Sequence, residues 1–152
     1  MSNVLSHNFG TVEFASGEEF VFPNGLPGFP GETDFLPVEV PDQLPLVYLQ
    51  STRTSDLCFV AAPVNCLVAD YEFSARAEDL ASVDLGPDTL GGPGMLCLAV
   101  LCFSEDGTAT ANLRAPIIVN LRNRRGVQAI QNEDRYPIRF AIGMREGGSK
   151  CS

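Results

Sequence analysis

The segment of residues 22–31 limits the possible folds more than any other part of the chain. It reads Phe-Pro-Asn-Gly-Leu-Pro-Gly-Phe-Pro-Gly, with three prolines and three glycines in ten residues. Because proline fixes φ and removes a backbone N–H donor, this segment cannot form a helix or continue a central strand. We therefore predict a structured loop that Leu26 and Phe29 anchor to the core.

The rest of the chain consists of short apolar or alternating runs separated by Pro and Gly, a pattern typical of β-strands. Ser74 is a candidate N-cap for one short helix that extends to about Val83 and ends at Gly86-Pro87. About ten short strands and one helix favour a single all-β, mainly antiparallel, barrel-like domain, because closure removes exposed edges. The predicted strands are residues 9–14 and 19–22, joined around Ser16-Gly17, then 35–40, 46–50, 57–62, 95–103, 109–113, 116–121, 126–131 and 138–142.

We expect this domain to cover residues 1–145 and residues 146–152 to form a flexible tail. The longest apolar stretch, residues 95–103, has nine residues, whereas a helix needs roughly 20 to cross a bilayer. The N-terminus lacks the basic start and apolar core of a secretory signal. These features predict a cytoplasmic protein that does not contact a membrane.

Charge is distributed unevenly along the chain. Residues 1–112 contain 16 acidic and 2 basic side chains, a net of −14, and residues 113–152 contain 3 acidic and 8 basic side chains, a net of +5, which sum to −9. An acidic body repels nucleic acid but attracts a basic protein, although acidity also serves solubility. We therefore expect no direct contact with nucleic acid, and interpret the basic stretch 122–125 as a strand turn or a protein contact.

The chain lacks the residues that common catalytic and metal sites need. Its only histidine, His7, lies in an N-terminal segment that we expect to be flexible, and nucleophilic catalysis usually needs such a base. The five cysteines have no CxxC spacing, which argues against zinc, and their odd number favours five free thiols in a reducing compartment. We predict no catalytic residue, no cofactor, no metal site and no enzymatic activity.

Two acidic pairs remain as candidate functional residues. On a strand, Asp70 and Glu72 would share a face, while Glu78 and Asp79 lie near the start of the predicted helix. Such pairs can serve as carboxylate dyads or cation ligands, and many are only solvated. We select all four as candidate protein-binding residues because they cluster around one strand end and the following helix start.

Four blocks of the sequence stand out, namely Phe22–Phe29, Leu57–Val60 running on to Asp70–Phe73, Thr110–Asn120 and Arg135–Arg139. Together they resemble the family of the flagellar assembly factor FliW and occur in that family's order. Read physically, the same blocks mainly maintain the fold and need not form the binding surface. The chain departs from the family in the Gly- and Pro-rich segment 86–94 and in the tail after Ile142.

The resemblance implies a cytoplasmic regulator, monomeric when free, that binds the RNA-binding translational repressor CsrA and is itself sequestered by flagellin. When flagellin is exported, the freed regulator binds CsrA and relieves repression of flagellin translation. We expect non-competitive antagonism, in which the acidic body lowers the potential beside the RNA site. The alternatives are a flagellin chaperone that never binds CsrA and, from another class, a small-molecule-binding barrel with polar groups in an apolar pocket.

Overall fold

The computed structural model describes residues 2–15, 17–26, 28–86, 92–131 and 135–142. Within these residues the chain forms eleven strands, two short α-helices and one 3₁₀ helix. In chain order the elements are β1 (Ser2–Ser6), β2 (Gly10–Phe14), β3 (Phe20–Val21), β4 (Asp34–Val38), η1 (Pro41–Gln43), β5 (Val47–Ser51), β6 (Cys58–Pro63), α1 (Val64–Leu67), α2 (Ala77–Ala81), β7 (Met95–Phe103), β8 (Ala109–Ala111), β9 (Ile117–Asn120), β10 (Arg125–Gln128) and β11 (Phe140–Ile142).

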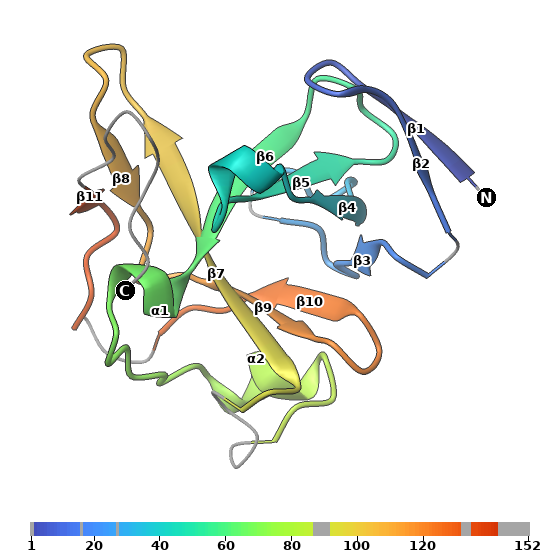
Figure 1. Ribbon diagram of the computed structural model, residues 1–152. Coiled ribbons are helices and arrows are strands. Elements are labelled where there is room, and N and C mark those ends of the chain that lie inside the picture. Colours follow the sequence, from blue (N-terminus) through green and yellow to red (C-terminus); the bar gives the residue numbers. More distant parts are fainter. Residues whose placement is uncertain (1, 16, 27, 87–91, 132–134, 143–152) are drawn as a thin grey trace.

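Seven of the strands close into a barrel (Figure 1). The order around the ring is β3-β4-β5-β6-β7-β9-β10, and β10 returns to β3. All neighbours are antiparallel except β3 and β10, which pair in parallel through Val21 and Arg125. The predicted mainly antiparallel barrel is therefore confirmed.

Strand β7 joins the barrel to an extension of the sheet. Its first half pairs with β9 and its second half pairs with β8, which in turn pairs with β11. Side chains alternate along β7, so that Leu96, Leu98 and Val100 pack inside the barrel while Cys97 and its alternate neighbours pack outside. Both faces of β7 are covered as far as Leu101, which accounts for the continuous apolar run, whereas Cys102 and Phe103 at its end are exposed.

Leu26 attaches the Pro-Gly loop to the barrel, and close backbone packing within the loop fixes its shape. Leu26 is buried in the interior cluster with Phe22, as predicted. Phe29 is 41% exposed, so the prediction that it anchors the loop in the core is wrong; its ring instead forms a T-shaped pair with the ring of Phe59. Gly25 has a φ of 68°, and a Cβ there would lie 2.4 Å from the Phe29 carbonyl oxygen, so the turn requires glycine.

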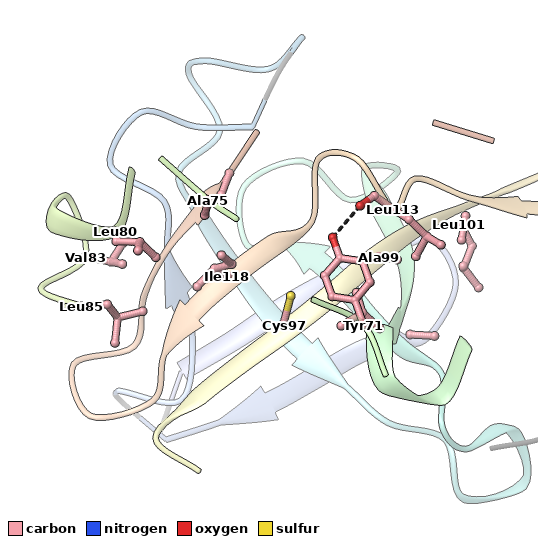
Figure 2. Packing of buried hydrophobic residues seen from close by; sticks show 14 of the residues in the cluster. Tyr71, Ala75, Leu80, Val83, Leu85, Cys97, Ala99, Leu101, Leu113 and Ile118 are labelled. Carbon is pink, nitrogen blue, oxygen red and sulfur yellow. Dashed lines mark hydrogen bonds between the residues drawn. The ribbon is translucent and has the colours of Figure 1, made fainter. Parts of the chain in front are cut away.

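The chain between β6 and β7 covers the outer face of β7 and β9 (Figure 2). The buried side chains of this segment pack in one cluster with Ile118; they are Tyr71, Leu80, Val83 and Leu85. No helix among the described residues is long and apolar enough to cross a membrane.

The N-terminal residues differ from the prediction. Strands β1 and β2 form a hairpin that packs Val4 and Phe14 against Leu36. His7 lies in its turn and donates its backbone N–H to the Ser55 carbonyl at 2.7 Å, so the predicted flexible segment is wrong. The strands predicted at residues 9–14 and 19–22 correspond to β2 and β3, which do not pair with each other: β2 pairs with β1, and β3 pairs with β4 and β10.

The predicted helix is shorter than expected. It is α2, with Arg76 at the N-cap position and no side-chain cap. Ser74 does not cap it, because it lies two residues before the N-cap position; its backbone N–H donates to Gln131 Oε1 at 2.8 Å. The predicted stop at Pro87 and the predicted tail 146–152 lie outside the described residues.

The cysteines also differ in part from the prediction. Cys58, Cys97 and Cys102 carry free thiols, whereas Cys66 is disulfide-bonded. The prediction of five free thiols is therefore wrong for Cys66, because an odd number of cysteines excludes only complete pairing.

Candidate protein-binding site

The segment that carries the four candidate acidic residues is irregular between α1 and α2. Asp70 and Glu72 are not on a strand, which corrects the predicted shared strand face. The chain nevertheless turns Tyr71 inward and leaves both carboxylates exposed. The segment is held by contacts with Ile130, Gln131, Arg135 and Tyr136, which lie far away in the sequence.

A buried polar network around Tyr71 makes this attachment. The Tyr71 hydroxyl donates to the Leu113 carbonyl at 2.5 Å (Figure 2) and accepts a hydrogen bond from Gln131 Nε2. Its ring stacks on Tyr136 with centroids 4.3 Å apart. Burial, then the proximity of Cys97, raises the pKa of Tyr71 well above its usual value, so the hydroxyl stays protonated and continues to donate.

Arginines neutralise three of the four candidate carboxylates. Glu72 forms an ion pair with Arg135. On α2, Arg76 contacts Glu78 at 3.6 Å and Asp79 at 3.3 Å. Asp79 Oδ2 also accepts the backbone N–H of residue 130 at 3.4 Å.

Four carboxylates and two guanidiniums leave a net charge of −2 on this surface, half of what the carboxylates alone carry. Among the four, Asp70 makes no ion pair with the described residues. The surface formed by Asp70, Glu72, Glu78 and Asp79 is called the α2 acidic patch below. Its weakened charge means that the patch presents mixed charge to a partner.

A second set of acidic side chains, none of which forms an ion pair with a described residue, was not singled out from the sequence. Residues 1–69 contain eight acidic side chains and one basic side chain, Arg53. None of the eight forms an ion pair with a described residue. Their elements, β1 to β5 with the connecting loops, lie together on the right of Figure 1, away from α2. Five of these side chains are exposed, and we call them the N-terminal acidic face: Glu13, Glu18, Glu39, Asp42 and Asp56.

The basic stretch 122–125 forms the turn between β9 and β10, as predicted. Arg124 has a φ of 59°, and its guanidinium lies 4.7 Å from the centroid of the Phe20 ring and donates to the Glu18 carbonyl. Arg122 and Arg125 are exposed and form no ion pair with the described residues. This turn therefore adds cations beside the edge of the N-terminal acidic face.

Within the part of the chain that the structure describes, no group of three His, Cys, Asp or Glu side chains gathers closely enough to hold a metal ion.

The sequence blocks that carry the resemblance supply side chains that hydrogen-bond to the backbone and stabilise the fold. Asn112 Oδ1 accepts the backbone N–H groups of Arg114 and Ala115 at 3.1 Å each and so shapes the turn after β8. Asn120 Nδ2 donates to the Val83 carbonyl at 2.8 Å and ties β9 to the segment that covers it.

Comparison with known proteins gives one family. The family model described as FliW protein matches residues 3–142. The chain belongs to the FliW family. Flagellar assembly factor FliW of Caldicellulosiruptor bescii is 32% identical over 142 residues, which cover 93% of this chain and 90% of that protein. The same factor from Bacillus licheniformis is 33% identical, covering 88% of this chain and 92% of the relative.

The fold agrees with a solved member of the FliW family. A crystal structure of the flagellar assembly factor FliW superposes with a TM-score of 0.79 at 26% identity, covering 92% of this chain and 96% of that one. The family model covers residues 3–142, which include the barrel and its extension as far as Ile142, the last residue of β11. The resemblance stated from the four sequence blocks is thus confirmed at the level of family and fold.

Proposed function

We propose that this chain is a cytoplasmic regulator, monomeric when free, that binds the translational repressor CsrA and flagellin and thereby couples flagellin translation to export. The match of residues 3–142 to the FliW family, with relatives named flagellar assembly factors, is the observation that carries this proposal. The chain acts by binding proteins and performs no catalysis. It does not bind nucleic acid directly, because its net charge of −9 opposes phosphate.

The uneven charge supports a role for electrostatics in binding a basic, RNA-binding partner. An acidic body attracts such a partner at long range and, once bound, lowers the potential that the RNA phosphates need. Because screening acts over roughly 8 Å at 0.15 M salt, the carboxylates responsible must lie close to the RNA path. The antagonism is then non-competitive, since the regulator repels RNA from beside its site.

The α2 acidic patch is our first candidate for this contact, and the N-terminal acidic face provides a matched comparison. We propose that Asp70 and Glu72 lie nearest to the RNA path. Two double variants each change the net charge by +4. The first is Asp70→Lys with Glu72→Lys, and the second is Glu39→Lys with Asp42→Lys. Both pairs are exposed, so neither variant should disturb the core.

The experiment measures the affinity of each variant for purified CsrA, and the displacement of a labelled leader RNA from CsrA, at two salt concentrations. The proposal expects the first variant to lose RNA displacement at low salt and the second to retain it. Equal losses would assign the effect to net charge, and unchanged values in both variants would refute electrostatic repulsion. Binding of native chain to flagellin, but not to CsrA, would favour the chaperone alternative.

A further inference from the structure

Cys66 forms a disulfide bond in a chain whose proposed place of action, the cytoplasm, is reducing. The residue lies on α1 and is half-buried. Cellular thiols keep most cytoplasmic cysteines reduced, and the disulfides that do form there are usually transient and often sense the redox state. The bond of Cys66 therefore has the character of a redox-controlled link and not of a permanent structural bridge.

The partner of Cys66 follows by elimination. The chain contains five cysteines, and three of the other four carry free thiols, namely Cys58, Cys97 and Cys102. Cys151 lies outside the described residues and is the only cysteine that remains. A disulfide of Cys66 within this chain therefore requires Cys151.

The chain that follows β11 is long enough to make this bond. Cys151 comes nine positions after Ile142, the last residue of β11, and an extended chain of that length spans up to roughly 30 Å. Ile142 and Leu67, the neighbour of Cys66 on α1, both pack against the cluster on the outer face of β7. Strand β11 and helix α1 also lie on the same side of the molecule, on the left of Figure 1. A bond between Cys66 and Cys151 thus closes over one face of the protein.

The same bond brings the C-terminal segment to the α2 acidic patch. Cys66 precedes Asp70 by four positions, and the chain between them is compact. Val68 donates its backbone N–H to the Val64 carbonyl at 2.8 Å, and Tyr71 donates its own to the Val68 carbonyl at 3.2 Å. Asp70 is exposed and makes no ion pair with the described residues. A segment bonded to Cys66 lies beside this carboxylate.

We propose that Cys66 and Cys151 form a reversible disulfide that ties the C-terminal segment to α1 and shields Asp70 under oxidising conditions. The oxidant is a low-molecular-weight disulfide. One protein thiolate attacks a sulfur of this disulfide and displaces one small thiol, and the second protein thiolate then attacks the mixed disulfide and displaces the other. Two protein thiols are thus oxidised, the small disulfide is reduced to two thiols, and these take up the two protons. An excess of the small thiol reverses both steps.

Peptide mapping of the full-length protein tests the link. The protein is incubated with oxidised glutathione, its remaining thiols are alkylated, and it is digested with trypsin in the absence of reductant. Because trypsin cleaves after arginine and lysine, the bond joins the peptide 54–76 to the dipeptide 151–152. Fragmentation of the linked peptide distinguishes Cys66 from Cys58. We expect this linked peptide after oxidation and its disappearance after treatment with dithiothreitol.

Two variants with the same substitution provide the control. Cys151→Ser should lose the linked peptide, whereas Cys102→Ser, which removes an exposed thiol at the end of β7, should keep it. A bond from Cys66 to a different cysteine of the native chain, a covalent dimer, or a Cys66 that carries only glutathione would overturn the proposal. Loss of the linked peptide in Cys102→Ser would overturn it as well.

A binding assay tests the shielding of Asp70, which rests on the proposed function. After the glutathione is removed, the oxidised chain should bind purified CsrA at least about threefold more weakly than the reduced chain does. Cys151→Ser should bind equally well with and without the oxidant. Equal affinities of the oxidised and reduced native chain, or an equal loss in Cys151→Ser, would overturn the shielding. Failure of the reduced chain to bind CsrA would instead refute the proposed function, and the peptide map alone then decides the link.

Discussion

Tyr71→Phe removes one hydroxyl group from the network that holds the α2 acidic patch in place. The hydroxyl donates to the Leu113 carbonyl and accepts from Gln131 Nε2, and both Tyr71 and Gln131 are buried. An unsatisfied buried polar group costs about 1–3 kcal/mol. Gln131 Nε2 still donates to the Glu72 carbonyl at 3.4 Å in the variant, so the lost hydrogen bond costs Gln131 less than it costs the Leu113 carbonyl. We therefore expect the free energy of unfolding to fall by about 2–4 kcal/mol.

Urea denaturation followed by far-UV circular dichroism measures this loss. The midpoint should fall while the m-value stays constant, since the substitution does not change the surface exposed on unfolding. For a chain of this length the melting temperature should fall by about 2–4 °C per kcal/mol. Tyr136→Phe is the matched control, because Tyr136 is only half-buried and its hydroxyl accepts the Glu72 backbone N–H at 2.8 Å, where water can replace it.

The control should lose less than about 1 kcal/mol, the usual net value of one exchangeable hydrogen bond. A Tyr71→Phe variant within about 0.5 kcal/mol of the native chain, at constant m-value, would refute the reasoning. It would mean that the two partner groups find other hydrogen bonds in the folded state.

Three further predictions concern packing and thiol chemistry. Gly126→Ala should lower stability by about 1–3 kcal/mol in a thermal melt, because the new Cβ would lie 2.4 Å from a buried phenylalanine ring. Leu26→Ala should cost about 2–4 kcal/mol in urea and Phe29→Ala less than about 1 kcal/mol, since only Leu26 is buried; equal losses would contradict the assignment. The exposed Cys102 should react with a thiol reagent within the folded protein, whereas Cys97, whose pKa is raised by burial, should react only on unfolding; equal rates for the two would show that Cys97 is accessible.

Local patterns in the sequence determined most of the strands. The strand predicted over residues 95–103 coincides with β7, because a nine-residue apolar run bounded by Gly94 and Ser104 is typical of a strand that is covered on both faces over most of its length. The Pro-Gly loop was also predictable, since the restrictions that proline imposes are local. The same patterns predicted a barrel-like fold, because about ten short strands need closure to avoid open edges.

Strand pairing was decided by the tertiary structure. Strand β2 pairs with β1 and not with β3, and the N-terminal residues, which sequence reasoning treated as flexible, are held by contacts of Val4 and Phe14 with β4. Phe29 was misplaced for the same reason, since an aromatic side chain in a loop has no periodicity that would distinguish a buried ring from an exposed one.

The candidate site shows the same division. The four carboxylates were visible in the sequence, and the pairing of Arg76 with Asp79 at i, i+3 could have been read from it. The pairing of Glu72 with Arg135 could not, because 63 positions separate the two residues and tertiary contacts, such as the packing of Tyr71 on Tyr136, bring them together. Local propensity acts over a few residues, whereas charge neutralisation depends on contacts between segments far apart in the chain, which exist only once the barrel has closed.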